Sequence, residues 1–133
     1  MASIFREIRL GAAPEAVWAA VREVGAVDRL APGFVTACTL EGSVRTVTFA
    51  NGATVKEAIV DLDDRGRRLA YTTLGGRASH YAASLLVSPT AGGSTLAWRI
   101  DLLPDELAPA IAGMVELGVS AITRRFEAPP RQV

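Results

Sequence analysis

The sequence predicts an α+β fold in which a curved, seven-stranded antiparallel sheet wraps around a long C-terminal helix, with two short helices after the first strand. Three observations lead to this prediction. The N-terminus alternates apolar and polar residues, the region from Phe34 to Leu103 repeats strand-like runs between short turns, and apolar residues after Pro104 recur at helical spacing. With 133 residues, half of them apolar, we expect one domain over residues 1–133.

The N-terminal part is expected to form a strand followed by two short helices. Residues 4–10 alternate with the period of a half-buried strand. Pro14 suits the first position of a helix, and Glu15 places a negative charge in its first turn. Gly25 ends this helix, and residues 28–30 form a second turn of helix before the chain becomes extended again.

The middle of the chain reads as six successive strands. The strands are separated by turn sequences: Glu41-Gly42-Ser43, Ala50-Asn51-Gly52, Asp63-Asp64-Arg65-Gly66, Gly75-Gly76 and Pro89-Thr90-Ala91-Gly92-Gly93. Such short connections cannot hold the crossover that a parallel pair needs. The strands are therefore expected to form an antiparallel meander.

The C-terminal segment from Asp105 to Phe126 reads as one long helix. It begins with acidic residues and ends with Arg124 and Arg125, which complement the helix dipole. Pro109 is tolerated only in the first turn or at a kink, and Pro129-Pro130 is expected to end the helix. The face toward the sheet carries Ile111, Met114, Val115, Gly118 and Ile122. Its small residues either leave space beneath the helix or allow close contact with the sheet.

Glu57 is the residue whose placement has the largest consequence. If the preceding turn is the two-residue Asn51-Gly52, Glu57 points to water and Lys56 faces inward. If the turn is the three-residue Ala50-Asn51-Gly52, Glu57 faces the apolar interior opposite Arg45. A carboxylate in the interior must be neutral, paired or hydrated. The alternation of the chain leaves both registers open.

Composition excludes several classes of function. Basic and acidic residues balance at 14 each without a charged block, which disfavours a nucleic-acid partner. The lone Cys38 has no cysteine or histidine companions, so we expect no metal site, and no sequence motif indicates a cofactor. The N-terminus has no secretory apolar core and no run reaches about 20 apolar residues, so no membrane span and a cytoplasmic location are expected.

Several motifs together resemble the helix-grip superfamily known as SRPBCC or START-like, in its polyketide cyclase/dehydrase-like, pollen-allergen-like branch. They cover nearly the whole chain: Ala13-Pro14-Glu15-Ala16-Val17-Trp18, Val55-Lys56-Glu57-Ala58-Ile59, Asp63-Asp64, Leu69-Ala70-Tyr71, Val87-Ser88-Pro89, Ser94-Thr95-Leu96-Ala97-Trp98 and Leu103-Pro104. The resemblance implies a ligand cavity between sheet and helix and favours the inward register of Glu57. The abscisic acid receptors of this superfamily use a lysine that is missing here from Pro32-Gly33-Phe34, and their gate and latch loops are longer. A hormone-receptor role is therefore not supported.

The function expected from this resemblance is binding of a small hydrophobic molecule of lipid-, aromatic- or polyketide-like character, by a monomer or homodimer. The expected ligand-binding residues are Arg45, Val47, Phe49, Glu57, Ile59, Tyr71, Thr73, Tyr81, Ala83, Trp98, Ile111, Met114, Val115, Gly118 and Ile122. One alternative is an enzyme of the polyketide cyclase, aromatase or dehydrase type, with Glu57 or Tyr81 as acid or base. Another is a protein-interaction module without a ligand. His80 is expected to point outward, because its neighbour Tyr81 takes the inward face.

Overall fold

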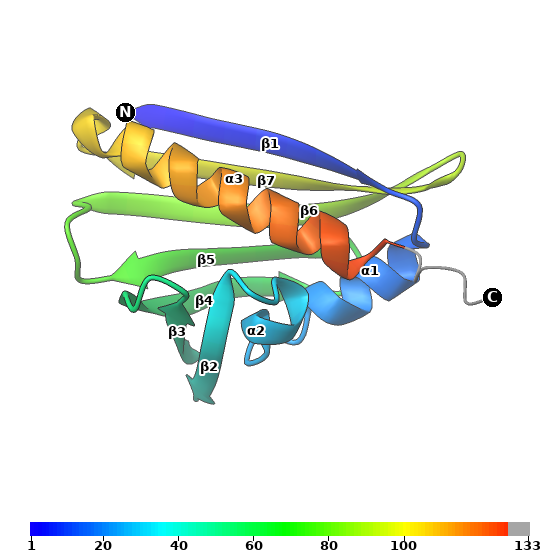
Figure 1. Ribbon diagram of the computed structural model, residues 1–133, viewed down its shortest axis with the longest axis horizontal. Helices are drawn as coiled ribbons and strands as arrows, with labels where there is room; N and C mark the ends of the chain where they lie inside the picture. The colour runs from blue at the N-terminus through cyan, green and yellow to red at the C-terminus, as the bar shows by residue number, and fades with distance from the viewer. Residues whose placement is uncertain (128–133) are drawn as a thin grey trace.

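A seven-stranded antiparallel sheet forms one layer of the molecule, and a long helix crosses its concave face (Figure 1). The computed structural model describes residues 1–127. The elements in chain order are β1 (Ala2–Leu10), α1 (Pro14–Val21), α2 (Val27–Leu30), β2 (Val35–Glu41), β3 (Val44–Phe49), β4 (Thr54–Asp63), β5 (Arg68–Leu74), β6 (His80–Thr90), β7 (Gly93–Leu103), the 3-10 turn η1 (Asp105–Leu107) and α3 (Ala108–Arg125). This arrangement confirms the predicted helix-grip fold.

The strand order is β1-β7-β6-β5-β4-β3-β2. The strands β2 to β7 form the predicted meander, and β1 pairs with the last of them, so that Ile4 lies opposite Ile100 and Ile8 opposite Leu96. The first and the last strand in sequence are therefore neighbours at one edge of the sheet. Strand β2, at the other side, has one partner.

The core lies between the inward face of the sheet and α3. Alternation along each strand sends every second side chain inward, and Leu69, Leu96, Ile100 and Leu102 are almost completely buried. From α3, the buried residues are Val115, Gly118, Ala121 and Ile122, whereas Leu117 is exposed. By length and composition alone, the helical segment Asp105–Arg125 is apolar enough to cross a membrane. Packing of one face of α3 on the sheet accounts for that apolar character.

The long C-terminal helix begins later than the sequence predicts. Residues 105–107 form the 3-10 turn η1, and the regular helix starts at Ala108. Pro109 lies in the first turn of α3, where its missing N–H group breaks no hydrogen bond. The helix ends at Arg125, and the predicted stop signal Pro129-Pro130 lies outside the described residues.

Hydrogen bonds to one carboxylate link helix α1 to the turn between β4 and β5. Asp64 accepts a hydrogen bond from the indole of Trp18 at 2.9 Å and from the guanidinium of Arg22 at 2.7 Å. The hydrogen bond from Arg22, together with that from Trp18, lowers the pKa of Asp64 below its ordinary value. These contacts hold the short helices at one end of the sheet, beside the C-terminal part of α3 (Figure 1).

Replacing Asp64 with asparagine is expected to lower stability at neutral pH but not in acid. The pKa of Asp64 is lower in the folded state than in the unfolded state, so the ionised carboxylate stabilises the fold above pH of about 4. That stabilisation is lost as pH falls through the folded pKa. Urea unfolding of both proteins between pH 7 and pH 2 measures this, and a stability difference independent of pH would contradict it.

Candidate functional site

The turn between β3 and β4 has three residues, as the inward register of Glu57 requires. Thr48 pairs with Thr54, and the amide of Phe49 donates to the carbonyl of Ala53 at 2.9 Å. Gly52 has a φ angle of 88°, which is the left-handed conformation that glycine tolerates best. The side chain of Asn51 accepts a hydrogen bond from the Ala53 amide at 2.9 Å and further supports this turn. The prediction of the three-residue turn is thus confirmed.

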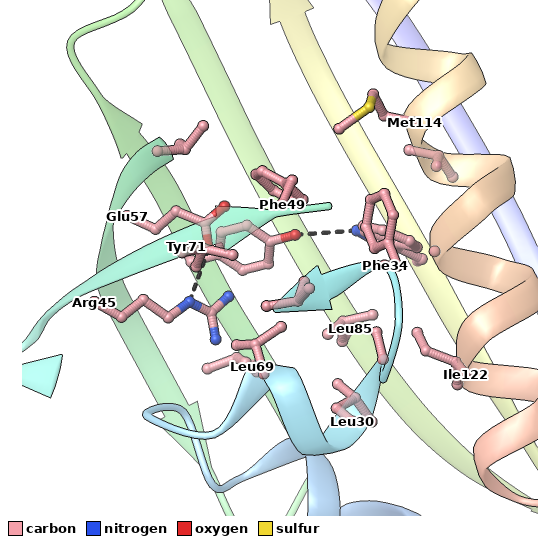
Figure 2. A pocket seen from close by; sticks show the side chains of 18 of the residues that line it. Leu30, Phe34, Arg45, Phe49, Glu57, Leu69, Tyr71, Leu85, Met114 and Ile122 are labelled. Atoms are coloured by element: carbon pink, nitrogen blue, oxygen red, sulfur yellow. Dashed lines mark hydrogen bonds and ion pairs between the residues drawn. The ribbon is translucent and has the colours of Figure 1, made fainter. Parts of the chain in front are cut away.

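Arg45 and Glu57 form a buried ion pair on the inward face of the sheet. The two residues pair across β3 and β4, and Nε of Arg45 lies 2.8 Å from Oε1 of Glu57 (Figure 2). The exposed fraction is 4% for Arg45 and 8% for Glu57. Lys56, the inward residue of the rejected register, is exposed. The polar pair that one register predicted is therefore part of the interior.

Two further groups hold the guanidinium of Arg45. Its Nη1 donates to the backbone carbonyl of Val24 at 3.3 Å, and its Cζ lies 4.7 Å from the centre of the Tyr71 ring. Both contacts suit a planar cation removed from water. The segment after α1 thus helps to orient a side chain of β3.

Burial raises the pKa of the Glu57 carboxyl above its ordinary value, and the charge of Arg45 offsets part of this rise. The cause is desolvation, since the carboxylate has lost most of its contact with water. A carboxyl with a raised pKa can donate or accept a proton closer to neutral pH than an exposed one.

A cavity of about 170 Å³ lies between the sheet, α3 and the short helices. In Figure 2, Glu57 and Arg45 approach it from the sheet, and Met114 and Ile122 from α3. Most of its lining is apolar. The lining residues are Val21, Glu23, Val27, Leu30, Ala31, Phe34, Val35, Arg45, Val47, Phe49, Val55, Glu57, Leu69, Tyr71, Thr73, Tyr81, Leu85, Trp98, Ile111, Met114, Val115, Gly118 and Ile122.

Two tyrosines and a tryptophan add hydrogen-bonding groups to the cavity wall. The indole N–H of Trp98 donates to the hydroxyl of Tyr71 at 3.1 Å (Figure 2). Burial raises the pKa of both Tyr71 and Tyr81, with a smaller contribution from the negative charge of Glu57. Both side chains therefore stay neutral hydroxyls near neutral pH.

The structure brings together most of the residues that the sequence predicted to bind ligand. All of them line the cavity except Ile59 and Ala83. Ala83 lies between its cross-strand partners Tyr71 and Ile100, whose larger side chains extend beyond its methyl group. Ile59 directly precedes an irregularity in the pairing of β4 with β5 and packs against the core from there. Their predicted place in the cavity wall is wrong.

The sequence did not identify the lining from the short helices and the segment after them. Val27, Leu30 and Phe34 contribute to the cavity wall at this end. Phe34 packs on Phe49 with ring centres 5.1 Å apart, and it also reaches α3, since a side chain at Gly118 would touch it. The three-residue spacing of Val27 and Leu30, which places both on one face of a helical turn, was the sequence signal that could have identified them as inward-facing.

Two other candidate groups lie away from the cavity. His80 is exposed, as its alternation predicts. Cys38 is half-buried on β2, with its sulfur 3.8 Å from the carbonyl oxygen of Val24. Within residues 1–127, no three His, Cys, Asp or Glu side chains lie close enough together to hold a metal ion.

Solved structures with the same fold come from bacteria and plants. An uncharacterized protein from Bacillus thuringiensis is 19% identical, with a TM-score of 0.84 over 94% of this chain and 98% of that one. A protein from Thermobifida fusca is 27% identical, with a TM-score of 0.78 over 95% and 93% of the two chains. Truncated norcoclaurine synthase from Thalictrum flavum is 19% identical, with a TM-score of 0.70 over 92% and 91%.

No curated protein matches the chain in sequence. A family model described as "Polyketide cyclase / dehydrase and lipid transport" matches residues 1–128. This match spans the sheet, the helices α1, α2 and α3, and both partners of the Arg45–Glu57 ion pair. The chain therefore belongs to the polyketide cyclase/dehydrase and lipid transport family, within the helix-grip superfamily that its sequence motifs resemble.

Proposed function

We propose that the protein binds a small, largely apolar molecule in the cavity between the sheet and α3. The observation that carries this proposal is a cavity of about 170 Å³ with an apolar wall and a few polar groups that converge from β3 to β6. Membership of a family described by cyclase, dehydrase and lipid transport activities supports it. Cavities of this composition are typical of small-molecule sites.

The size of the cavity indicates the size of the ligand. An apolar cavity of about 150 Å³ in another protein accommodates benzene. The cavity here is similar in volume, so it accommodates one aromatic ring or an aliphatic segment of similar size. Affinity would come mainly from removal of apolar surface from water, at about 25 cal/mol per Å².

The polar groups would orient the ligand rather than supply most of the affinity. Arg45 contacts both Glu57 and Tyr71, and Tyr81 lines the same cavity. A ligand oxygen facing these groups would leave the apolar part against α3. The proposal places the protein in the cytoplasm, where a free thiol such as that of Cys38 stays reduced.

An enzyme of the cyclase or dehydrase type is the second candidate. The raised pKa of Glu57 favours it, because a carboxyl facing a cavity with such a pKa can transfer protons. Tyr81 is the second acid or base candidate in the same wall. Turnover of an aromatic polyketide substrate that stops in Glu57→Gln, with binding retained, would establish this activity.

Toluene is expected to bind the wild-type protein saturably and to lose binding when Val115 is replaced with phenylalanine. Val115 is buried on the face of α3 that lines the cavity, so a larger ring there fills the space that the ligand would use. Titration of ¹⁵N-labelled protein followed by amide chemical shifts measures binding and locates it. The Ile111→Phe variant, at a half-buried lining position, tests the same space with less crowding of the core.

The matched control is Leu117→Phe, which adds the same ring on the exposed side of the same helix. It should bind toluene like the wild type. Absence of saturable binding, or binding that survives both Val115→Phe and Ile111→Phe, would overturn the proposal. The first result would favour a protein-interaction module.

A further inference from the structure

The buried charges in the cavity cancel. Of the described residues that line it, Arg45 is the one with a positive charge, and Glu57 neutralises it at 2.8 Å. The remaining charged lining residue, Glu23, has a side chain that is 67% exposed and lies 3.7 Å from Arg22, so water screens it. The interior thus presents a neutral ion pair, and the described lining residues include no basic residue besides Arg45.

A negatively charged ligand would find no free positive charge among the described residues that line this cavity. The guanidinium of Arg45 already contacts Glu57, the Val24 carbonyl and the face of the Tyr71 ring. A carboxylate that entered would bring a second negative charge close to Glu57. Burial of an unpaired charge costs more free energy than one further hydrogen bond returns.

The cavity does offer neutral hydrogen-bonding groups. The oxygen of Tyr71 accepts from Trp98, so its own O–H remains a donor. Every fully buried polar side-chain atom of the described residues has a hydrogen-bond partner. The hydroxyl of Tyr81 has no such partner among these residues, so it is not fully buried. The Tyr81 oxygen is therefore accessible, and its residue lines the cavity.

From this balance we infer that the cavity selects a neutral, single-ring aromatic molecule that carries a hydroxyl or carbonyl oxygen, in preference to a carboxylate of the same size. The ring occupies the apolar part of the cavity beside α3, and the oxygen faces Tyr71 and Tyr81. This inference rests on the proposed function and adds the charge and hydrogen-bonding class of the ligand.

Three probes of nearly equal size test it at neutral pH: p-cresol, benzoate and toluene. Amide chemical-shift titrations of the wild type should give p-cresol an affinity about 100-fold higher than that of benzoate. Tyr81→Phe should lower the affinity for p-cresol relative to that for toluene about 5-fold, because it removes one hydroxyl and little volume. Glu57→Gln should reduce the preference for p-cresol over benzoate by at least about tenfold, because it leaves the charge of Arg45 available.

The results separate this inference from the proposed function. Binding of benzoate within about threefold of p-cresol in the wild type would overturn the inference while leaving the cavity a ligand site. Equal affinities for p-cresol and toluene, unchanged by Tyr81→Phe, would overturn it as well. Failure of all three probes, toluene included, would overturn the proposed function itself. If Glu57→Gln does not fold, the wild type and Tyr81→Phe decide the question.

Discussion

Replacing Glu57 with leucine is expected to lower the free energy of unfolding by about 3–5 kcal/mol. The substitution leaves the guanidinium of Arg45 at 4% exposure without its counter-charge. Its contact with the Val24 carbonyl at 3.3 Å remains, but a backbone oxygen carries no net charge to balance the cation. Urea unfolding at pH 7, followed by circular dichroism, measures the effect.

The double variant Arg45→Met/Glu57→Leu is the control for this prediction. Removal of both charges also removes the free-energy cost of burying them, which is the effect that raises the pKa of Glu57. The double variant should therefore be as stable as the wild type or more stable by about 1–4 kcal/mol. A single variant as stable as the wild type would contradict the buried ion pair. A double variant as unstable as the single would show that the two side chains matter for packing rather than for charge.

Replacing Leu85 with alanine is expected to lower the free energy of unfolding by about 2–5 kcal/mol. Leu85 is 5% exposed and lies in the cavity wall between its cross-strand partners Leu69 and Trp98. Its truncation removes buried methyl groups and enlarges an existing cavity, which the surrounding side chains cannot fill without moving. Chemical unfolding measures the loss, and a ligand larger than toluene should recover part of it by binding the folded state alone.

The neighbouring residue provides the matched control. Leu86 follows Leu85 on β6 but points to the opposite face and is 38% exposed. Leu86→Ala should cost about 1 kcal/mol or less, because the side chain buries less area and leaves no cavity. Equal losses for the two variants would contradict the assignment of Leu85 to the cavity wall.

Local patterns in the sequence were sufficient for the order of the elements. Alternation identified the inward residues Tyr71, Tyr81 and Trp98, and helical spacing identified the buried face of α3. These signals are reliable because the side-chain period of a strand or helix follows from backbone geometry. The errors occurred at Ile59, which directly precedes an irregularity in the pairing of β4 with β5, and at Ala83, which lies between the larger residues Tyr71 and Ile100; neither lines the cavity.

The cavity wall at the short helices shows a second limit of sequence reasoning. Val27 and Leu30 belong to α2 and Phe34 to the turn after it, and the position of this region relative to the sheet depends on contacts far away in the chain. One of these contacts is the hydrogen bond between Trp18 and Asp64, which are 46 residues apart. Such pairs leave no periodic signal.

By itself, the sequence determined the seven strands, the long helix and the two possible environments of Glu57. Only the tertiary structure decided between those environments, through the three-residue turn that pairs Arg45 with Glu57 on the inward face. The physical reason is that both registers satisfy the backbone hydrogen bonds of the hairpin, so local energetics alone do not separate them. The choice depends on the apolar side chains that the whole sheet places against α3, and this long-range packing also leaves the cavity open.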